Sequence, residues 1–222
     1  MIQAPVPAQI IDKGIATACL LAQVLVAKYA DHLPLYRQEG IFARAGIATP
    51  RSTLGAWVGL CDVQLQPLVD ALRQELLGHR ELHADETPMA MLKPGNKKTH
   101  RAYLWAYVLG VFEDMKAVIY IFCESRAGEH ARAFLDDGQL PIDNNWAENQ
   151  IRPIAIGRKN WPFAGSLRAG QRVAAIMSLI QSARLNGHDP YAHLKDVLQR
   201  LPTHKNYLIA KLLPHRWQTL NS

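Results

Sequence analysis

The sequence predicts an α/β protein in which a helical region precedes a three-stranded antiparallel meander with C-terminal helices. Apolar residues recur at helical spacing in the first and last thirds of the chain, whereas the middle third holds β-forming runs separated by turn residues. With 222 residues, 49% of them hydrophobic, the chain can bury one large core or two small ones. We expect a helical region over residues 1–78 and a second domain over residues 79–222.

Three helices are predicted in the helical region. Apolar residues spaced for one buried face predict a helix over residues 16–29 and a second over residues 35–45. A third begins after Pro50, because proline is favoured in a first turn, and extends to residue 77, with Pro67 marking a break or a restart.

The turn between the second and third helices is compatible with two structures. Two helices joined by a short glycine turn resemble a helix-turn-helix, which would place Arg51 and Ser52 against DNA. The alternative is an ordinary helical hairpin, and the turn alone does not decide between them.

The strands are predicted in the middle of the chain. Short apolar stretches at residues 82–85 and 89–92, followed by β-forming runs at 102–109 and 117–123, predict three strands joined by hairpins. Further on, apolar stripes and capping residues predict C-terminal helices, which we place at residues 171–185 and 191–201.

The charge balance favours an anionic partner. The net charge is +6 and the pI about 9.3, which favours nucleic acid before membrane, although a solvated basic surface gives the same number. The three cysteines lie far apart without a Cys-x-x-Cys pattern, so reduced cytosolic thiols are the simplest account. The apolar run over residues 15–27 is too short to span a bilayer, so we expect a soluble protein.

Glu148 is the first candidate for metal-dependent chemistry. It follows the polar residues 143–145, which open a helical turn, and a basic run comes after it. A lone acid beside several cations suits a site that holds a metal ion against a phosphate backbone. The alternative is a capping box, because Asn145 and Glu148 are three residues apart.

Asp85 is the second candidate. It lies at the end of an apolar stretch, where a carboxylate leaving a strand is held rigidly and can face a cleft. Two-metal phosphoryl chemistry needs such acids, and oxygen ligands suit Mg²⁺. The alternative is that Asp85 only ends a strand before the turn at Thr87-Pro88.

Basic residues supply candidate contacts to DNA phosphates. They occur in the third helix, in the loop after residue 92 and around Glu148, although a solvated face would show the same charges. The candidates are Arg51, Lys97, Lys98, Arg152, Arg158 and Lys159. Trp161 and Phe163 either stack on bases or, as we favour, seal the edge of a core.

Two motifs carry a resemblance to a known family. His-Ala-Asp-Glu-Thr at residues 83–87 precedes the meander, and Ile-Asp-Asn-Asn-Trp-Ala-Glu-Asn-Gln-Ile-Arg-Pro at residues 142–153 follows it. Together with the helical region and the tail, these motifs resemble the insertion-sequence-66 family of bacterial DDE transposases over nearly the whole chain.

The resemblance implies a partial ribonuclease-H-like domain and DNA strand transfer by three acids with Mg²⁺. The first Asp of the family falls on Asp85 and its closing Glu on Glu148. The middle Asp normally follows a strand after the meander, ahead of a long helical insertion, and this chain has neither. Residues 126–130 resemble the sequence before that strand, and residues 134–138 resemble the sequence after the insertion.

We therefore interpret the chain as an internally deleted, N-terminally shortened member whose strand-transfer activity is impaired. The deletion is expected to leave one edge of the sheet unpaired. The resemblance implies transposon-end DNA as a partner, a second copy or a full-length transposase as another, and a location in the bacterial cytoplasm, at the nucleoid when bound to DNA. Two alternatives are a non-enzymatic DNA-binding or oligomerising fragment and a pseudogene product without a stable role.

Overall fold

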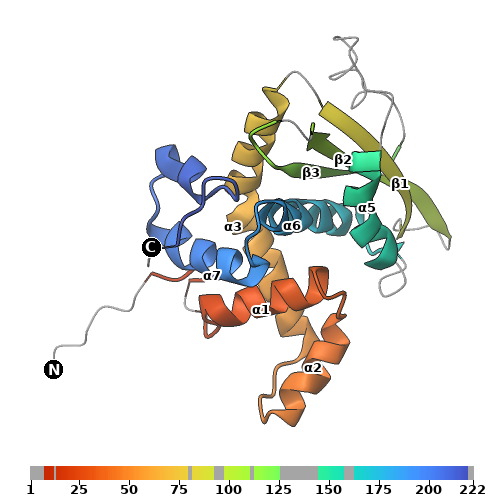
Figure 1. Ribbon diagram of the computed structural model, residues 1–222. Helices are drawn as coiled ribbons and strands as arrows, with labels where there is room; N and C mark the ends of the chain where they lie inside the picture. Colours follow the sequence, from red (N-terminus) through yellow and green to blue (C-terminus); the bar gives the residue numbers. More distant parts are fainter. Residues whose placement is uncertain are drawn as a thin grey trace.

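The computed structural model describes residues 8–12, 14–79, 82–92, 98–110, 113–125, 145–157 and 163–219. Its helices are α1 (Ala18–Tyr29), α2 (Leu35–Arg44), α3 (Arg51–Leu77), α5 (Asn145–Gly157), α6 (Leu167–Leu185), α7 (Pro190–Arg200), and the short 3₁₀ helices η1 (Leu201–Thr203) and η2 (Asn206–Leu212). Its strands are β1 (Leu82–Leu92), β2 (Thr99–Leu109), β3 (Val118–Cys123) and β4 (Phe163–Ala164). The predicted α/β class and the antiparallel meander are confirmed. Figure 1 shows the sheet at upper right, α1 and α2 at the bottom of the view, α7 at lower left, and α3 and α6 between these helices and the sheet.

Helix α3 is continuous through Pro67, so the predicted break or restart there is wrong. A proline inside a helix removes one backbone hydrogen bond and strains the preceding turn. The inner face of α3 offsets this cost, because Leu65 and Leu68 on either side of the proline are almost completely buried. Pro67 itself lies on the exposed face of the helix.

The sheet has the strand order β3-β2-β1-β4. Strands β1 and β2 pair in antiparallel fashion over their whole lengths, with Leu82 opposite Leu109 and Leu92 opposite Thr99. Strand β4 runs parallel to β1 and pairs with it near Met91. The expectation of an unpaired edge is therefore only partly right, because this short strand covers one end of the outer edge of β1.

Strand β1 is longer than the sequence pattern indicates. The two apolar stretches are joined by residues 86–88 into one strand, so Asp85 lies inside the strand and not at its end. The turn expected at Thr87-Pro88 is absent, since both residues pair with β2. Proline is tolerated at position 88 because no neighbouring strand that the structure describes needs an amide there. Among the described residues, β4 pairs with the outer edge of β1 only at Ala90 and Met91.

Helix α6 seals the outer edge of β3. The hydroxyl of Ser182 accepts a hydrogen bond from the amide of Val118 at 3.0 Å, and that of Ser178 accepts one from the amide of Tyr120 at 2.9 Å. The two serines are four residues apart on the helix, and the two amides are two residues apart on the strand. These separations span similar distances, so each serine lies opposite one amide. The helix can come this close because its facing positions carry small side chains.

One hydrophobic cluster includes residues of both expected domains. Leu21 of α1, Leu65 of α3 and Leu104 of β2 belong to it and are almost completely buried. Helix α1 packs against α7, and α3 packs against η2, so the two ends of the described chain share this core. The division between residues 78 and 79 stays a prediction. Among the described helices, none is both long enough and apolar enough to cross a bilayer.

Candidate functional site

The side chain of Asp85 lies on the face of the sheet that α5 covers. Asp85 is directly opposite Ala106, and Ala106 is directly opposite Tyr120, so the three form one row across the sheet. Side chains that are directly opposite in neighbouring strands share a face. The Tyr120 hydroxyl donates a hydrogen bond of 2.5 Å to the backbone oxygen of Gln150 in α5, which fixes the face of the whole row.

Glu148 lies in the first turn of α5, and its side chain is exposed. The indole nitrogen of Trp146 donates to the backbone oxygen of Leu109 at 3.0 Å, which holds this turn at the end of β2. Leu109 is opposite Leu82, three residues before Asp85 on β1. The first turn of α5 and the Asp85 segment of β1 therefore lie toward the same end of the sheet.

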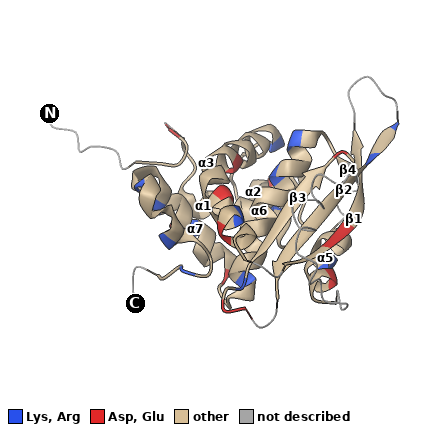
Figure 2. Cartoon of the chain, turned by 90° about the horizontal axis from the view of Figure 1, so that it is seen from above, with Lys and Arg blue, Asp and Glu red and all other residues tan. Residues whose placement is uncertain are grey.

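The structure thus places the two predicted acids on neighbouring elements. Helix α5 packs on β1 and β2, and Figure 2 shows acidic colour on both β1 and α5. A carboxylate in a first helical turn also interacts favourably with the helix N-terminus, so a local role for Glu148 stands beside the metal-binding one.

A divalent metal fits the described residues only in part. Asp85 and Glu148 would supply carboxylate oxygens, the ligands that Mg²⁺ prefers. Within the described ranges, however, no group of three or more Asp, Glu, His or Cys side chains is arranged to hold a metal ion. The acids Asp136 and Asp137 lie outside the described residues.

The predicted DNA-binding residues lie on separate elements. Arg51 begins α3, Lys98 precedes β2, and Arg152 is on α5, and all three side chains are exposed. Figure 2 shows the basic colour spread over the helices, the C-terminal segment and the β1–β2 hairpin. The other three candidates lie outside the described residues, namely Lys97, Arg158 and Lys159. The same is true of Trp161.

A second group of charged residues was not predicted as a site. Arg172 of α6 pairs with Asp62 of α3, with 3.4 Å between Nε and Oδ2. Burial raises the pKa of the Asp62 carboxyl, and the hydrogen bond from Arg172 opposes that shift. Lys28 of α1 is close enough for Arg172 to lower its pKa, in addition to the larger lowering by burial. No local pattern predicts this group, because its members come from three distant segments.

Comparison with known proteins shows the family. The sequence model of the IS66 transposase family matches residues 13–136 and 131–172, and that of the IS66 C-terminal element matches residues 178–215. The chain therefore belongs to the IS66 transposase family. The first model matches in two pieces that overlap at residues 131–136, which is where the sequence predicts an internal deletion. No solved structure matches the chain.

Two curated relatives from Sinorhizobium fredii agree with this deletion. The uncharacterized protein y4jD is 27% identical over 357 aligned positions, which cover 98% of this chain and 69% of the relative. The uncharacterized protein y4qI is 44% identical over 336 positions, covering 90% of this chain and 62% of that relative. Because the chain has 222 residues, the first alignment contains at least 357 − 222 = 135 positions where the chain has no residue.

Proposed function

We propose that this chain is a shortened DDE-type DNA transposase with a remnant ribonuclease-H-like domain. Asp85 and Glu148 are the two acids that remain of its metal site. The observation that carries this proposal is the row of Asp85, Ala106 and Tyr120, whose last member is bonded to α5, the helix of Glu148. The chain's membership of the IS66 transposase family supports the same assignment.

In this proposal the two carboxylates hold Mg²⁺, which when bound activates a water or a 3′-hydroxyl toward a DNA phosphate. The chain fixes the acids in place. Asp85 is held within a strand that is paired along its whole length, and the first turn of α5 is docked through Trp146. Exposed Arg152, one turn after Glu148, would contact the DNA backbone.

Strand transfer by the chain alone is proposed to be weak. A site with two carboxylates binds metal less tightly than one with three and leaves part of the metal charge unbalanced. The two pieces matched by the family model meet at residues 131–136, which is near where the resemblance expects the middle Asp. We therefore expect at most trace Mg²⁺-dependent cleavage of transposon-end DNA, and robust cleavage that Asp85→Ala abolishes would contradict this part of the proposal.

A shared metal site can be tested with Mn²⁺ as a paramagnetic probe. We expect Mn²⁺ to broaden the amide NMR signals around Asp85 in β1 and in the first turn of α5 at the same concentrations. Asp85→Asn should abolish both effects, whereas Asp70→Asn, a change to an exposed acid on α3, should abolish neither. Broadening of one segment without the other would show that the two acids do not share a metal.

A second candidate function is a DNA-binding or oligomerising fragment that does not cut DNA. It is favoured by the lack of a three-acid group among the described residues. We expect the purified chain to bind transposon-end DNA with an affinity that falls steeply with salt, because phosphate contacts release counterions. Fluorescence anisotropy between 50 and 200 mM salt, a range of about fourfold, measures this. Undetectable or salt-independent binding would remove this candidate.

A further inference from the structure

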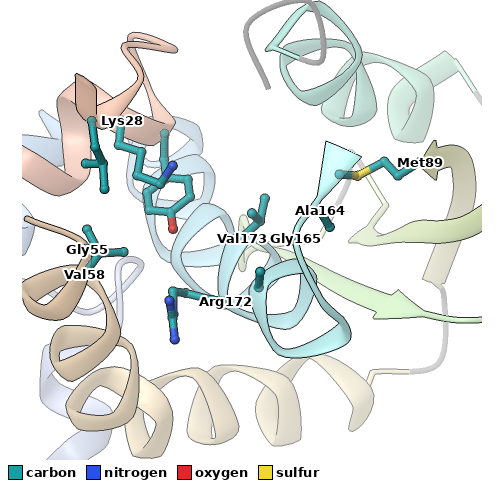
Figure 3. A pocket seen from close by; sticks show the side chains of 11 residues that line it. Lys28, Gly55, Val58, Met89, Ala164, Gly165, Arg172 and Val173 are labelled. Carbon is teal, nitrogen blue, oxygen red and sulfur yellow. The ribbon is translucent and has the colours of Figure 1, made fainter. Parts of the chain in front are cut away.

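A cleft of about 250 Å³ opens between the helical region and the sheet. Its apolar walls include Val58 of α3, Val173 of α6 and Met89 of β1. Figure 3 shows Lys28 extending from α1 and Arg172 reaching from α6 toward α3, with Met89 and Ala164 on the opposite side. The cleft therefore combines an apolar lining with two cationic side chains.

The two cations carry more charge than their surroundings balance. Asp62 is the one carboxylate paired with either of them in the part of the chain that the structure describes. Lys28 instead lies over the ring of Tyr29, with 5.1 Å from Nζ to the ring centroid. Burial, and then Arg172, lower the pKa of Lys28, so a charged Lys28 is held at a cost that a bound anion would offset.

The guanidinium of Arg172 is held in place on one side by α3. A Cβ added at Gly59 would lie 3.3 Å from Nη2 of Arg172, so the side chain rests closely on this glycine. The start of α6 also borders the cleft through Ala169, and Gly165 borders it just ahead of that helix. The N-terminus of a 19-residue helix adds partial positive charge on the same side.

We propose that this cleft binds a phosphate group, with Lys28 and Arg172 as its cationic contacts and the apolar walls against the attached sugar or base. The phosphate belongs either to a DNA strand or to a free nucleotide, and both have the same chemistry. Neither Asp85 nor Glu148 lines the cleft. The DNA form of the proposal rests on the proposed function, whereas the nucleotide form does not.

Removing the charge of Lys28 tests the cationic contact. We expect Lys28→Gln to weaken DNA binding about tenfold at low salt and to reduce the slope of log affinity against log salt by about 0.9, the loss of one phosphate contact. Lys211→Gln, which removes the same charge from an exposed position on η2, should change neither quantity as much. Equal effects of the two variants on DNA binding would overturn the DNA form of the proposal.

Filling the cleft tests the same site without removing charge. Gly55 lines the cleft from within α3, and a Cβ there would find its nearest neighbour, Leu35, at 3.9 Å. We expect Gly55→Leu to weaken phosphate binding severalfold while Tm stays the same or rises, because glycine is a poor helix former. Unchanged binding of every phosphate probe by a folded Gly55→Leu variant would contradict occupation of the cleft.

The choice of probe distinguishes a DNA phosphate from the phosphate of a free nucleotide. Single-stranded and duplex oligonucleotides are compared with a deoxynucleoside monophosphate, and binding is followed by NMR shifts of the Gly165 and Ala169 amides. Shifts with the monophosphate alone, lost in Lys28→Gln, support the nucleotide form even if DNA binding and the proposed function fail. DNA binding that is indifferent to both variants, with no shift by the monophosphate, overturns this inference and leaves the proposed function standing.

Discussion

Gly170 is a glycine because the ring of Phe122 occupies the space of a side chain. A Cβ built at Gly170 would overlap the Phe122 ring, which is 97% buried. We expect Gly170→Ala to destabilise the protein by about 1–3 kcal/mol, the usual cost of overpacking. Gly55→Ala, at an open position in α3, should instead stabilise it by about 0.5–1 kcal/mol. Urea unfolding of both variants measures the contrast, and similar losses would contradict it.

His193 makes stability depend on pH. It is completely buried, and its Nε2 lies 3.0 Å from the backbone oxygen of Leu212. Burial lowers the pKa of His193 from its ordinary value of 6.5 to about 4, and the hydrogen bond to Leu212 opposes this shift. The unfolded chain therefore takes up a proton first as the pH falls, so the stability present above pH 6.5 is lost progressively down to about pH 4.

The difference between the folded and unfolded pKa of His193 gives the size of this loss in the free energy of unfolding. Between pH 7.5 and pH 5.0, His193 should remove about 2 kcal/mol, since one pKa unit corresponds to about 1.4 kcal/mol. Urea unfolding at the two pH values measures it. In His193→Gln, which keeps an N–H donor without the titration, the difference between the two pH values should shrink by that amount. An unchanged difference would show that His193 is not the group responsible.

At the scale of elements, the contact between α6 and β3 depends on two hydroxyl groups. Ser178→Ala and Ser182→Ala would each leave a buried strand amide, that of Tyr120 or Val118, without its acceptor. We expect each change to cost about 1–3 kcal/mol and to speed hydrogen exchange at the amide concerned. Ser52→Ala, at an exposed position near the start of α3, is the matched control and should change stability little. Unaltered exchange at the two amides would show that the bonds do not hold the edge.

The elements that the sequence predicted well are those set by local pattern. The helical stripe of α6 and the cap of α7 by Asp189, which accepts from two amides, need no distant contact. Helix α3 continues through Pro67, and β1 continues through Asp85, because both pack against other segments. The periodicity of the local sequence gives no information on such packing. Local pattern marked both acids as candidates and the family resemblance implied their roles. Neither could predict the cleft between Lys28 and Arg172, because that pair is brought together by the fold.

At the scale of the whole molecule, the shared core predicts a single unfolding transition. Residues of the helical region and of the sheet belong to one cluster, and Trp217 near the C-terminus donates to Asp196 of α7 at 2.7 Å. We expect far-ultraviolet circular dichroism and tryptophan fluorescence to give the same Tm. Two separated transitions would instead support independent folding of residues 1–78 and 79–222.

The way in which α5 is docked has a consequence for the history of the chain. Trp146 and Gln150 bind this helix to β2 and β3 directly, so its place does not depend on the length of the connection that leads to it. Lengthening that connection of about 20 residues roughly eightfold would change only the closure entropy, by roughly 2 kcal/mol. Evolution could thus excise a large insert here in one step without disturbing the scaffold, and an engineer could graft a foreign folded module into the same gap.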